Sequence, residues 1–210
     1  MFLLRKIMYI FVTIFSFIYL STIFSYASDN TDIKFLSRCV TCHSLSGSSV
    51  ITMYPKIGGQ HYDYMLKQLF EFKKGKNGNR FDPTMLGMLQ GISESDLEKL
   101  ALYYSKQETT SNKFISNDSL FQEGRDIYFY GGRKSEIPAC VSCHSNNGMG
   151  NELANYPALK WQHKEYLCIQ MNKFKTSERS NDLNGIMRDI ASKMTKEQIE
   201  AVSFYISLMN

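Results

Sequence analysis

The sequence predicts an all-α protein made of two tandem domains of similar size. The first observation is a pentapeptide, Cys-x-x-Cys-His, that occurs at residues 39–43 and again at residues 140–144. The second is an internal repeat with an offset of about 102 residues. The third is a helical spacing of apolar residues in each repeat, with little that indicates strands. A chain of 210 residues is long enough for two small domains.

The N-terminus reads as an export signal. Arg5 and Lys6 precede an apolar run over residues 7–24, and Ser25-Tyr26-Ala27 matches a small-x-small cleavage site. We therefore expect residues 1–27 to be a signal peptide and the protein to be exported to the periplasm. The apolar run is long for a signal peptide and near the lower limit for a spanning helix, so an uncleaved membrane anchor is the alternative.

We expect a first domain at residues 28–107, a polar linker at 108–117 and a second domain at 118–210. The repeat supports this division because landmarks of one half recur in the other. The matched segments are Tyr54-Pro55 with Tyr156-Pro157, Gln60-His61 with Gln162-His163, and Met85 with Met187.

Each domain has the same expected order of three helices. The first leads to the pentapeptide, the second lies in the middle and the third closes the domain. The expected ranges are 31–42, 61–74 and 94–107 in the first half, and 118–130, 163–175 and 196–208 in the second. Gly131-Gly132 ends the first helix of the second half. Ser93 and Thr195 begin capping-box patterns in front of the C-terminal helices.

The pentapeptide is the attachment signature of a c-type haem. Two cysteines three residues apart lie about one helical turn from each other, so both thiols can reach the two vinyl groups of one haem. The adjacent histidine then meets the iron as the proximal ligand. The expected residues are Cys39, Cys42 and His43 for one haem, and Cys140, Cys143 and His144 for the other.

A structural zinc site is the alternative for Cys-x-x-Cys. We disfavour it because the histidine directly follows the second cysteine and no further cysteine pair completes a tetrahedral site. The fifth cysteine, Cys168, lies in an apolar helical pattern and is expected to be a small buried core residue.

The sixth ligand of each iron separates carriers from enzymes, and methionine opposite histidine raises the reduction potential. The chain has 11 methionines, but only Met85 and Met187 are paired by the repeat. We expect both to be axial ligands, in the loop just before each C-terminal helix. The rivals are His61 and His163, which the repeat also pairs. We favour a surface or helix-capping role for these two because each begins a middle helix directly after a glutamine.

Further features concern the surroundings of the haem. The carbonyl of Pro55 or Pro157 can accept the second N–H of the proximal histidine. Arg80, and more loosely Arg179, are placed to approach a haem propionate.

With these landmarks the chain resembles the cytochrome c4 family of dihaem cytochromes over residues 30–210. The segments that carry the resemblance are 54–60 (Tyr-Pro-Lys-Ile-Gly-Gly-Gln), 67–69, 85–89, Gly131-Gly132, 137–140 and 186–188. The family implies two cytochrome c-like domains, each wrapping one covalently attached haem and related by a pseudo-twofold axis. It also implies periplasmic electron transfer toward terminal oxidases, often with membrane association, and supports Met85 and Met187 as ligands. The segment 159–162 departs from the pattern, and we expect Trp161 to repack the loop near the second haem.

The expected function is a dihaem electron carrier, not an enzyme, that passes electrons between its haems and on to a redox partner such as a terminal oxidase. A quinol-oxidising complex is one expected donor. A catalytic, peroxidase-like cytochrome would need one open distal face with acid/base groups beside it, which the sequence does not offer. A fixed subunit of a larger respiratory complex is a further alternative. Beyond residue 27 there are 22 basic and 20 acidic residues, so the charge does not indicate a nucleic-acid partner.

Overall fold

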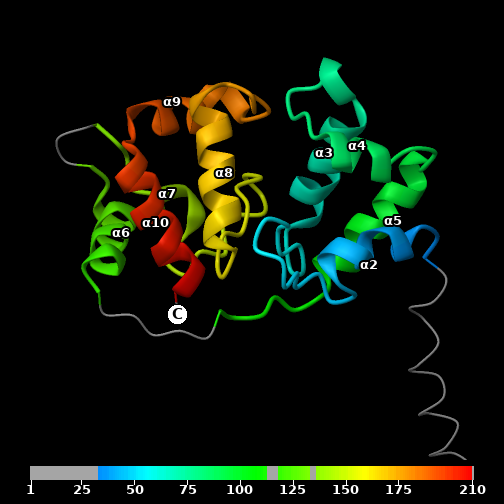
Figure 1. The fold of residues 1–210 in the computed structure, drawn as a ribbon, viewed down its shortest axis with the longest axis horizontal. Helices are drawn as coiled ribbons and strands as arrows, with labels where there is room; N and C mark the ends of the chain where they lie inside the picture. Colours follow the sequence, from blue (N-terminus) through cyan, green and yellow to red (C-terminus); the bar gives the residue numbers. More distant parts are fainter. Residues whose placement is uncertain (1–32, 113–117, 133–135, 210) are drawn as a thin grey trace, which may run out of the picture. The chain divides into compact units, whose positions relative to one another are not determined.

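The structure is a computed structural model, and it describes residues 33–112, 118–132 and 136–209 (Figure 1). The expected signal peptide and residues 113–117 of the expected linker lie outside the described residues. Helices are the regular elements of the described part, together with three isolated β-bridges. The all-α prediction is confirmed. Among the described residues, no helix has both the length and the apolar character needed to cross a membrane.

From the middle helix of each half onward, the helices follow the repeat closely; before it, α2 runs through the pentapeptide and begins five residues after the predicted start, whereas the second half has two separate helices there. The first half holds α2 (Leu36–His43), α3 (Tyr62–Lys73), α4 (Pro83–Met88) and α5 (Glu94–Ser105), with a 3₁₀ turn at Gly75–Asn77. The second half holds α6 (Ser119–Tyr130), α7 (Val141–His144), α8 (Lys164–Lys175), α9 (Ile186–Lys193) and α10 (Lys196–Leu208), with a 3₁₀ turn at Leu183–Gly185. The middle and C-terminal helices begin and end within two residues of the predicted positions.

The ends of the helices explain this agreement. Thr195 makes a complete capping box with Gln198 in front of α10, and the Ser93 hydroxyl accepts from the Asp96 N–H at the start of α5. Gly131, with φ of 69°, ends α6 as predicted.

Three short helices were not predicted, and two of them, α4 and α9, carry the methionines that were expected in loops. In α4 the Asp82 carboxylate accepts from the N–H groups of Thr84 and Met85, both at 3.0 Å, and Pro83 occupies the first turn. In α9 the Asp182 carboxylate accepts from the Arg188 N–H at 3.0 Å. Met85 and Met187 therefore lie in the first turn of α4 and α9, not in a loop.

Each half buries its own core. In the first half α3 packs on α4 and α5, and in the second α10 packs on α6 and α8. The buried residues of α5 are Leu97, Leu100, Ala101, Tyr103 and Tyr104, and those of α10 include Ile199, Ala201, Val202, Tyr205 and Ile206. These sets contain most of the apolar positions that the helical spacing predicts.

Residues 35–210 form one compact unit, and the described part of the linker is fastened to both halves. The Lys56 ammonium donates to the Thr110 carbonyl (2.7 Å) and to the Asn112 side-chain oxygen (2.6 Å). The Asn112 side-chain amide donates to the carbonyls of Trp161 (2.9 Å) and Ser207 (2.8 Å). Residues 108–112 are thus a strap rather than a free connection.

The crossing of α6 and α10 depends on a glycine. A Cβ atom at Gly124 would lie 2.0 Å from the Ala201 carbonyl oxygen, which is backbone and cannot move aside alone. We expect Gly124→Ala to lower the free energy of unfolding by about 3 kcal/mol through overpacking, measured by guanidinium denaturation of the holoprotein. Glu123→Ala, at an exposed position of the same helix, is the control and should change it by less than about 0.5 kcal/mol. Equal stability of the two variants would show that the helices do not meet here.

Candidate haem-binding sites

The two histidines of the pentapeptides end their helices and are buried. His43 closes α2 with 8% of its surface exposed, and His144 closes α7 with 7% exposed. Nδ1 of His43 lies 2.9 Å from the Pro55 carbonyl oxygen, and Nδ1 of His144 lies 3.0 Å from that of Pro157. A carbonyl only accepts, so in both rings Nδ1 carries the proton and Nε2 keeps its lone pair.

Burial lowers the pKa of both imidazoles, while the hydrogen bond to the proline carbonyl raises it by a smaller amount. Both rings are therefore neutral at pH 7, as a metal ligand must be. Among the described residues none hydrogen-bonds Nε2 of either ring. Each ring lies beside a tyrosine, with centroids 6.4 Å apart in an edge contact for His43 and Tyr54, and 6.5 Å apart in a tilted arrangement for His144 and Tyr156.

The pentapeptide cysteines are half-buried, and those of the first half share one turn of α2. Burial raises the pKa of Cys39 and of Cys140 to about 11, so neither thiol is a thiolate at pH 7. Within the described residues no group of three or more His, Cys, Asp or Glu side chains is placed to hold a metal ion. Thiols one turn apart beside a neutral imidazole with an available Nε2 fit a covalently attached haem.

Two tyrosines that the sequence did not single out hold the backbone just beyond the histidines. The Tyr104 hydroxyl donates to the Ser44 carbonyl at 3.1 Å, and the Tyr128 hydroxyl donates to the Ser145 carbonyl at 2.6 Å. Both serines have positive φ, 64° and 65°, so the chain turns sharply after each histidine. Burial raises the pKa of both phenols, which keeps them donors. Tyr104 lies in α5 and Tyr128 in α6, so the repeat gave no signal for this pair.

The methionines expected as distal ligands lie at equivalent places. Met85 sits on α4, which packs against α3, and Met187 sits on α9, which packs against α8. Both side chains are half-buried. Cys168 is also half-buried and packs against the core of the second half, rather than being fully buried as expected.

His61 and His163 are neither surface residues nor side-chain caps. Each occupies the N-cap position of its helix without a capping hydrogen bond. Nε2 of His61 lies 2.8 Å from the Met149 carbonyl oxygen, and Nε2 of His163 lies 2.8 Å from that of Ser49. Each ring therefore donates Nε2–H to the backbone of the other half, so Nε2 has no free lone pair for iron. The preference for a surface or capping role was wrong because the partners lie 88 and 114 residues away.

The backbones of Arg80 in the first half and Arg179 in the second form an isolated antiparallel β-bridge. Arg80 donates to Tyr166 and Gln170 of the second half, and Arg179 donates to Tyr64 and Gln68 of the first. Both side chains are buried, and each guanidinium stacks on a phenyl ring at 4.4 Å, Phe72 or Phe174.

These guanidinium charges shift the pKa of neighbouring side chains. Burial lowers the pKa of Arg179, and the charge of Arg80 lowers it further. Burial raises the pKa of Tyr64, but the positive charges of Arg179 and Arg80 outweigh that effect and the net pKa is lowered. The sequence pointed to these arginines individually, and the structure adds their polar partners in the opposite half.

Trp161 does not repack its loop, contrary to expectation. Its φ is 61°, close to the 72° of Gly59 at the matching position of the first half. The same backbone hydrogen bond forms in each half, from the Gly59 N–H to the Tyr104 carbonyl and from the Trp161 N–H to that of Ile206. The indole N–H donates to the Met209 carbonyl at 2.7 Å. This contact holds a residue type for which left-handed backbone is unfavourable.

Comparison with known proteins agrees with this arrangement. The cytochrome c family pattern matches residues 34–107 and 122–210. Cytochrome c4 of Azotobacter vinelandii is 38% identical over 175 residues, which cover 80% of this chain and 82% of that protein. Cytochrome c4 of Stutzerimonas stutzeri is 36% identical with the same coverage. The crystal structure of reduced recombinant cytochrome c4 from Pseudomonas stutzeri superposes with a TM-score of 0.81 at 34% identity, covering 88% of this chain and all of that one.

The repeated sites and these similarities lead to one conclusion. The chain belongs to the cytochrome c4 family and is a dihaem electron carrier with two covalently attached c-type haems.

Proposed function

We propose that this protein is a periplasmic electron carrier in which both haems have histidine and methionine as axial ligands. Cys39 and Cys42 attach the first haem and His43 binds its iron, with Met85 on the distal side. The second set is Cys140, Cys143, His144 and Met187. The observation that supports this proposal best is the hydrogen bond from Nδ1 of each proximal histidine to a proline carbonyl, at 2.9 and 3.0 Å. It leaves Nε2 of a neutral ring as the ligand atom.

A c-type haem, when bound, supplies reversible one-electron exchange between ferrous and ferric iron. The chain's own residues set the potential at which this occurs. The proline carbonyls orient the imidazoles, and a thioether opposite an imidazole favours the ferrous state and raises the potential. The buried positive charges of Arg80 and Arg179 act in the same direction on any nearby iron.

The partners are redox proteins. We propose a donor on the quinol-oxidising side of a respiratory chain and a terminal oxidase as acceptor, with residues 28–107 and 118–210 as the two haem domains. Export by the N-terminal segment places the carrier in the periplasm, where membrane association keeps it near both partners. This proposal rests on the export pattern of residues 1–27 and on the kinship with cytochrome c4.

The cysteine assignment predicts haem stoichiometry. Wild-type protein matured with a cytochrome c assembly system should carry two covalent haems per chain by pyridine haemochrome assay. Replacing both Cys39 and Cys42 with Ala should leave one, and replacing Cys140 and Cys143 should leave the other. Cys168→Ala is the matched control and should retain both. A double variant that keeps two covalent haems would contradict the assignment.

The ligand assignment predicts spectra and potentials. Wild-type ferric protein should show the weak far-red band of methionine-ligated haem at the strength of two haems. Met85→Ala or Met187→Ala should halve the band, lower the potential of one haem and open that haem to carbon monoxide, because the thioether that favours the ferrous state is gone. Met88→Ala, three residues after Met85 and exposed at the end of α4, is the control. An unchanged band in either ligand variant would refute that ligand.

A further inference from the structure

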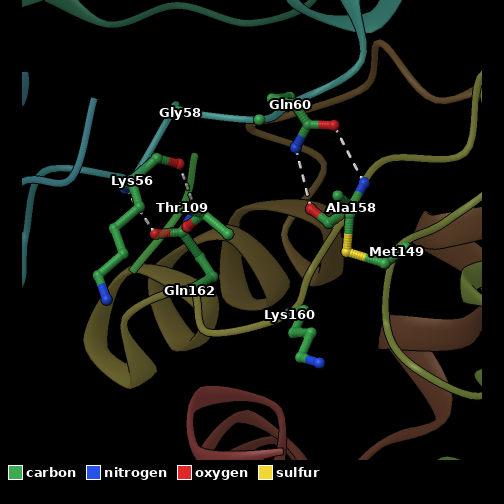
Figure 2. Close-up of a pocket in the computed structure, with 9 residues that line it drawn as sticks. Lys56, Gly58, Gln60, Thr109, Met149, Ala158, Lys160 and Gln162 are labelled. Atoms are coloured by element: carbon green, nitrogen blue, oxygen red, sulfur yellow. Dashed lines mark hydrogen bonds between the residues drawn. The ribbon is translucent and has the colours of Figure 1, made fainter. Parts of the chain in front are cut away.

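The matched Gln-His pairs at residues 60–61 and 162–163 join the two halves in a reciprocal way. The Gln162 side-chain amide pairs with the backbone of Lys56, accepting from its N–H at 2.8 Å and donating to its carbonyl at 2.7 Å. The Gln60 amide pairs with Ala158 in the same way, at 3.0 Å and 2.9 Å. Figure 2 shows both pairs side by side. Each glutamine side chain therefore hydrogen-bonds both backbone groups of one residue in the opposite half.

These two residues, Lys56 and Ala158, directly follow the prolines that orient the proximal histidines. The peptide group between Pro55 and Lys56 accepts from His43 through its carbonyl and donates to Gln162 through its N–H. A peptide group is planar, so holding its N–H also fixes the direction of its carbonyl. The Pro157–Ala158 peptide is held between His144 and Gln60 in the same manner.

The histidine of each pair adds a second attachment to the same opposite loop. His163 donates to the Ser49 carbonyl at 2.8 Å, and the Ser49 hydroxyl donates to the carbonyl of Cys42 at 2.8 Å. His61 donates to the Met149 carbonyl at 2.8 Å, five residues after His144. The segment between each histidine and its proline is thus held from the other half near its middle, at Ser49 or Met149, and again just after the proline, at Lys56 or Ala158.

We propose that Gln162 and Gln60 are positioning residues for the haem of the opposite half: Gln162 sets the proximal histidine of the first haem, and Gln60 that of the second. The inference rests on the proposed function in that His43 and His144 are taken as iron ligands. The orientation of each iron's proximal histidine therefore depends on a glutamine of the other half.

The expected effect on the reduction potential follows from three linked polar groups: the glutamine amide, the peptide group after the proline and the histidine imidazole. A hydrogen bond from Nδ1–H to a carbonyl makes the imidazole a stronger ligand. The carbonyl is a better acceptor when the N–H of the same peptide is itself hydrogen-bonded, because linked hydrogen bonds polarise one another. Removing the glutamine weakens the chain, so the imidazole donates less to iron, the ferric state is less stabilised and the potential rises.

The test compares Gln162→Leu with Gln60→Leu. Leucine is apolar and of similar size, and it removes the two hydrogen bonds to the opposite half together with the one that the glutamine Oε1 accepts from the N–H of the following histidine. The two variants are matched controls for each other, since each breaks one glutamine–backbone pair at the same interface. Potentials are measured by spectroelectrochemical titration, and haem methyl resonances in the NMR spectrum of the oxidised protein assign each potential to a domain through their contacts with residues of that domain.

We expect Gln162→Leu to change the reduction equilibrium constant of the first haem about threefold or more toward the ferrous state. The second haem should change by less than half as much. Gln60→Leu should give the reverse pattern. A general loosening of the interface would instead move both haems alike in both variants, and that result, or shifts confined to the haem of the glutamine's own half, would overturn the proposal.

A leucine variant could fail to fold because it leaves a buried peptide N–H and carbonyl without partners. Gln162→Glu and Gln60→Glu then serve in its place. The carboxylate still accepts from the peptide N–H and adds negative charge, so the opposite haem should shift toward the ferric state. A shift of the other haem, or of neither, would again overturn the inference.

The wild-type protein separates this inference from the proposed function. If its ferric spectrum lacks the methionine band at the strength of two haems, the proposed ligation fails whatever the variants show. If the band is present and the shifts are not crossed, only the positioning role fails. Covalent haem content and the unfolding midpoint of each variant confirm that the folded holoprotein is being compared.

Discussion

One hydrogen bond in each half organises what surrounds it, the bond from Nδ1 of the pentapeptide histidine to a proline carbonyl 12 or 13 residues later. It fixes the tautomer of the ring and leaves the lone pair on Nε2. The tyrosine before the proline lies beside the same ring. A second tyrosine, from α5 or α6, secures the turn that follows the histidine. The surrounding helices hold this short segment in place.

The halves are joined mainly by polar contacts with fixed directions. Side-chain amides pair with backbone, imidazoles donate to carbonyls, and two guanidinium groups bridge to tyrosine hydroxyls. Burying such groups is costly unless each one is paired, so the interface tolerates little displacement. An apolar interface of the same size could slide more easily, and the orientation of the histidine loops would be less well defined.

Much of the fold could be predicted because the same helix pattern occurs in both halves and depends on residues close together in the sequence. The middle and C-terminal helices have helical spacing, and the C-terminal helices also have capping residues. The short helices α4 and α9, with six and eight residues, were not predicted. The Asp82-Pro83 pair was the available clue to α4.

For the site, the pentapeptide predicts the cysteines and the histidine, and the repeat predicts Met85 and Met187 as distal ligands; these assignments stay predictions. The contacts of His61, His163 and the two arginines with the other half could not be predicted, because the partners lie far away in the sequence. The backbone of Trp161 was also beyond prediction. Its neighbours impose the conformation of a glycine, and no propensity of tryptophan indicates this.

The strap over residues 108–112 determines how the molecule meets other proteins. Lys56 and Asn112 fasten it to both halves, so the halves do not drift apart on a flexible tether. A protein that docks on one half thereby also fixes the direction in which the other half faces. A redox partner therefore meets one body in which the two halves are held together, and it does not have to wait for one half to swing toward it.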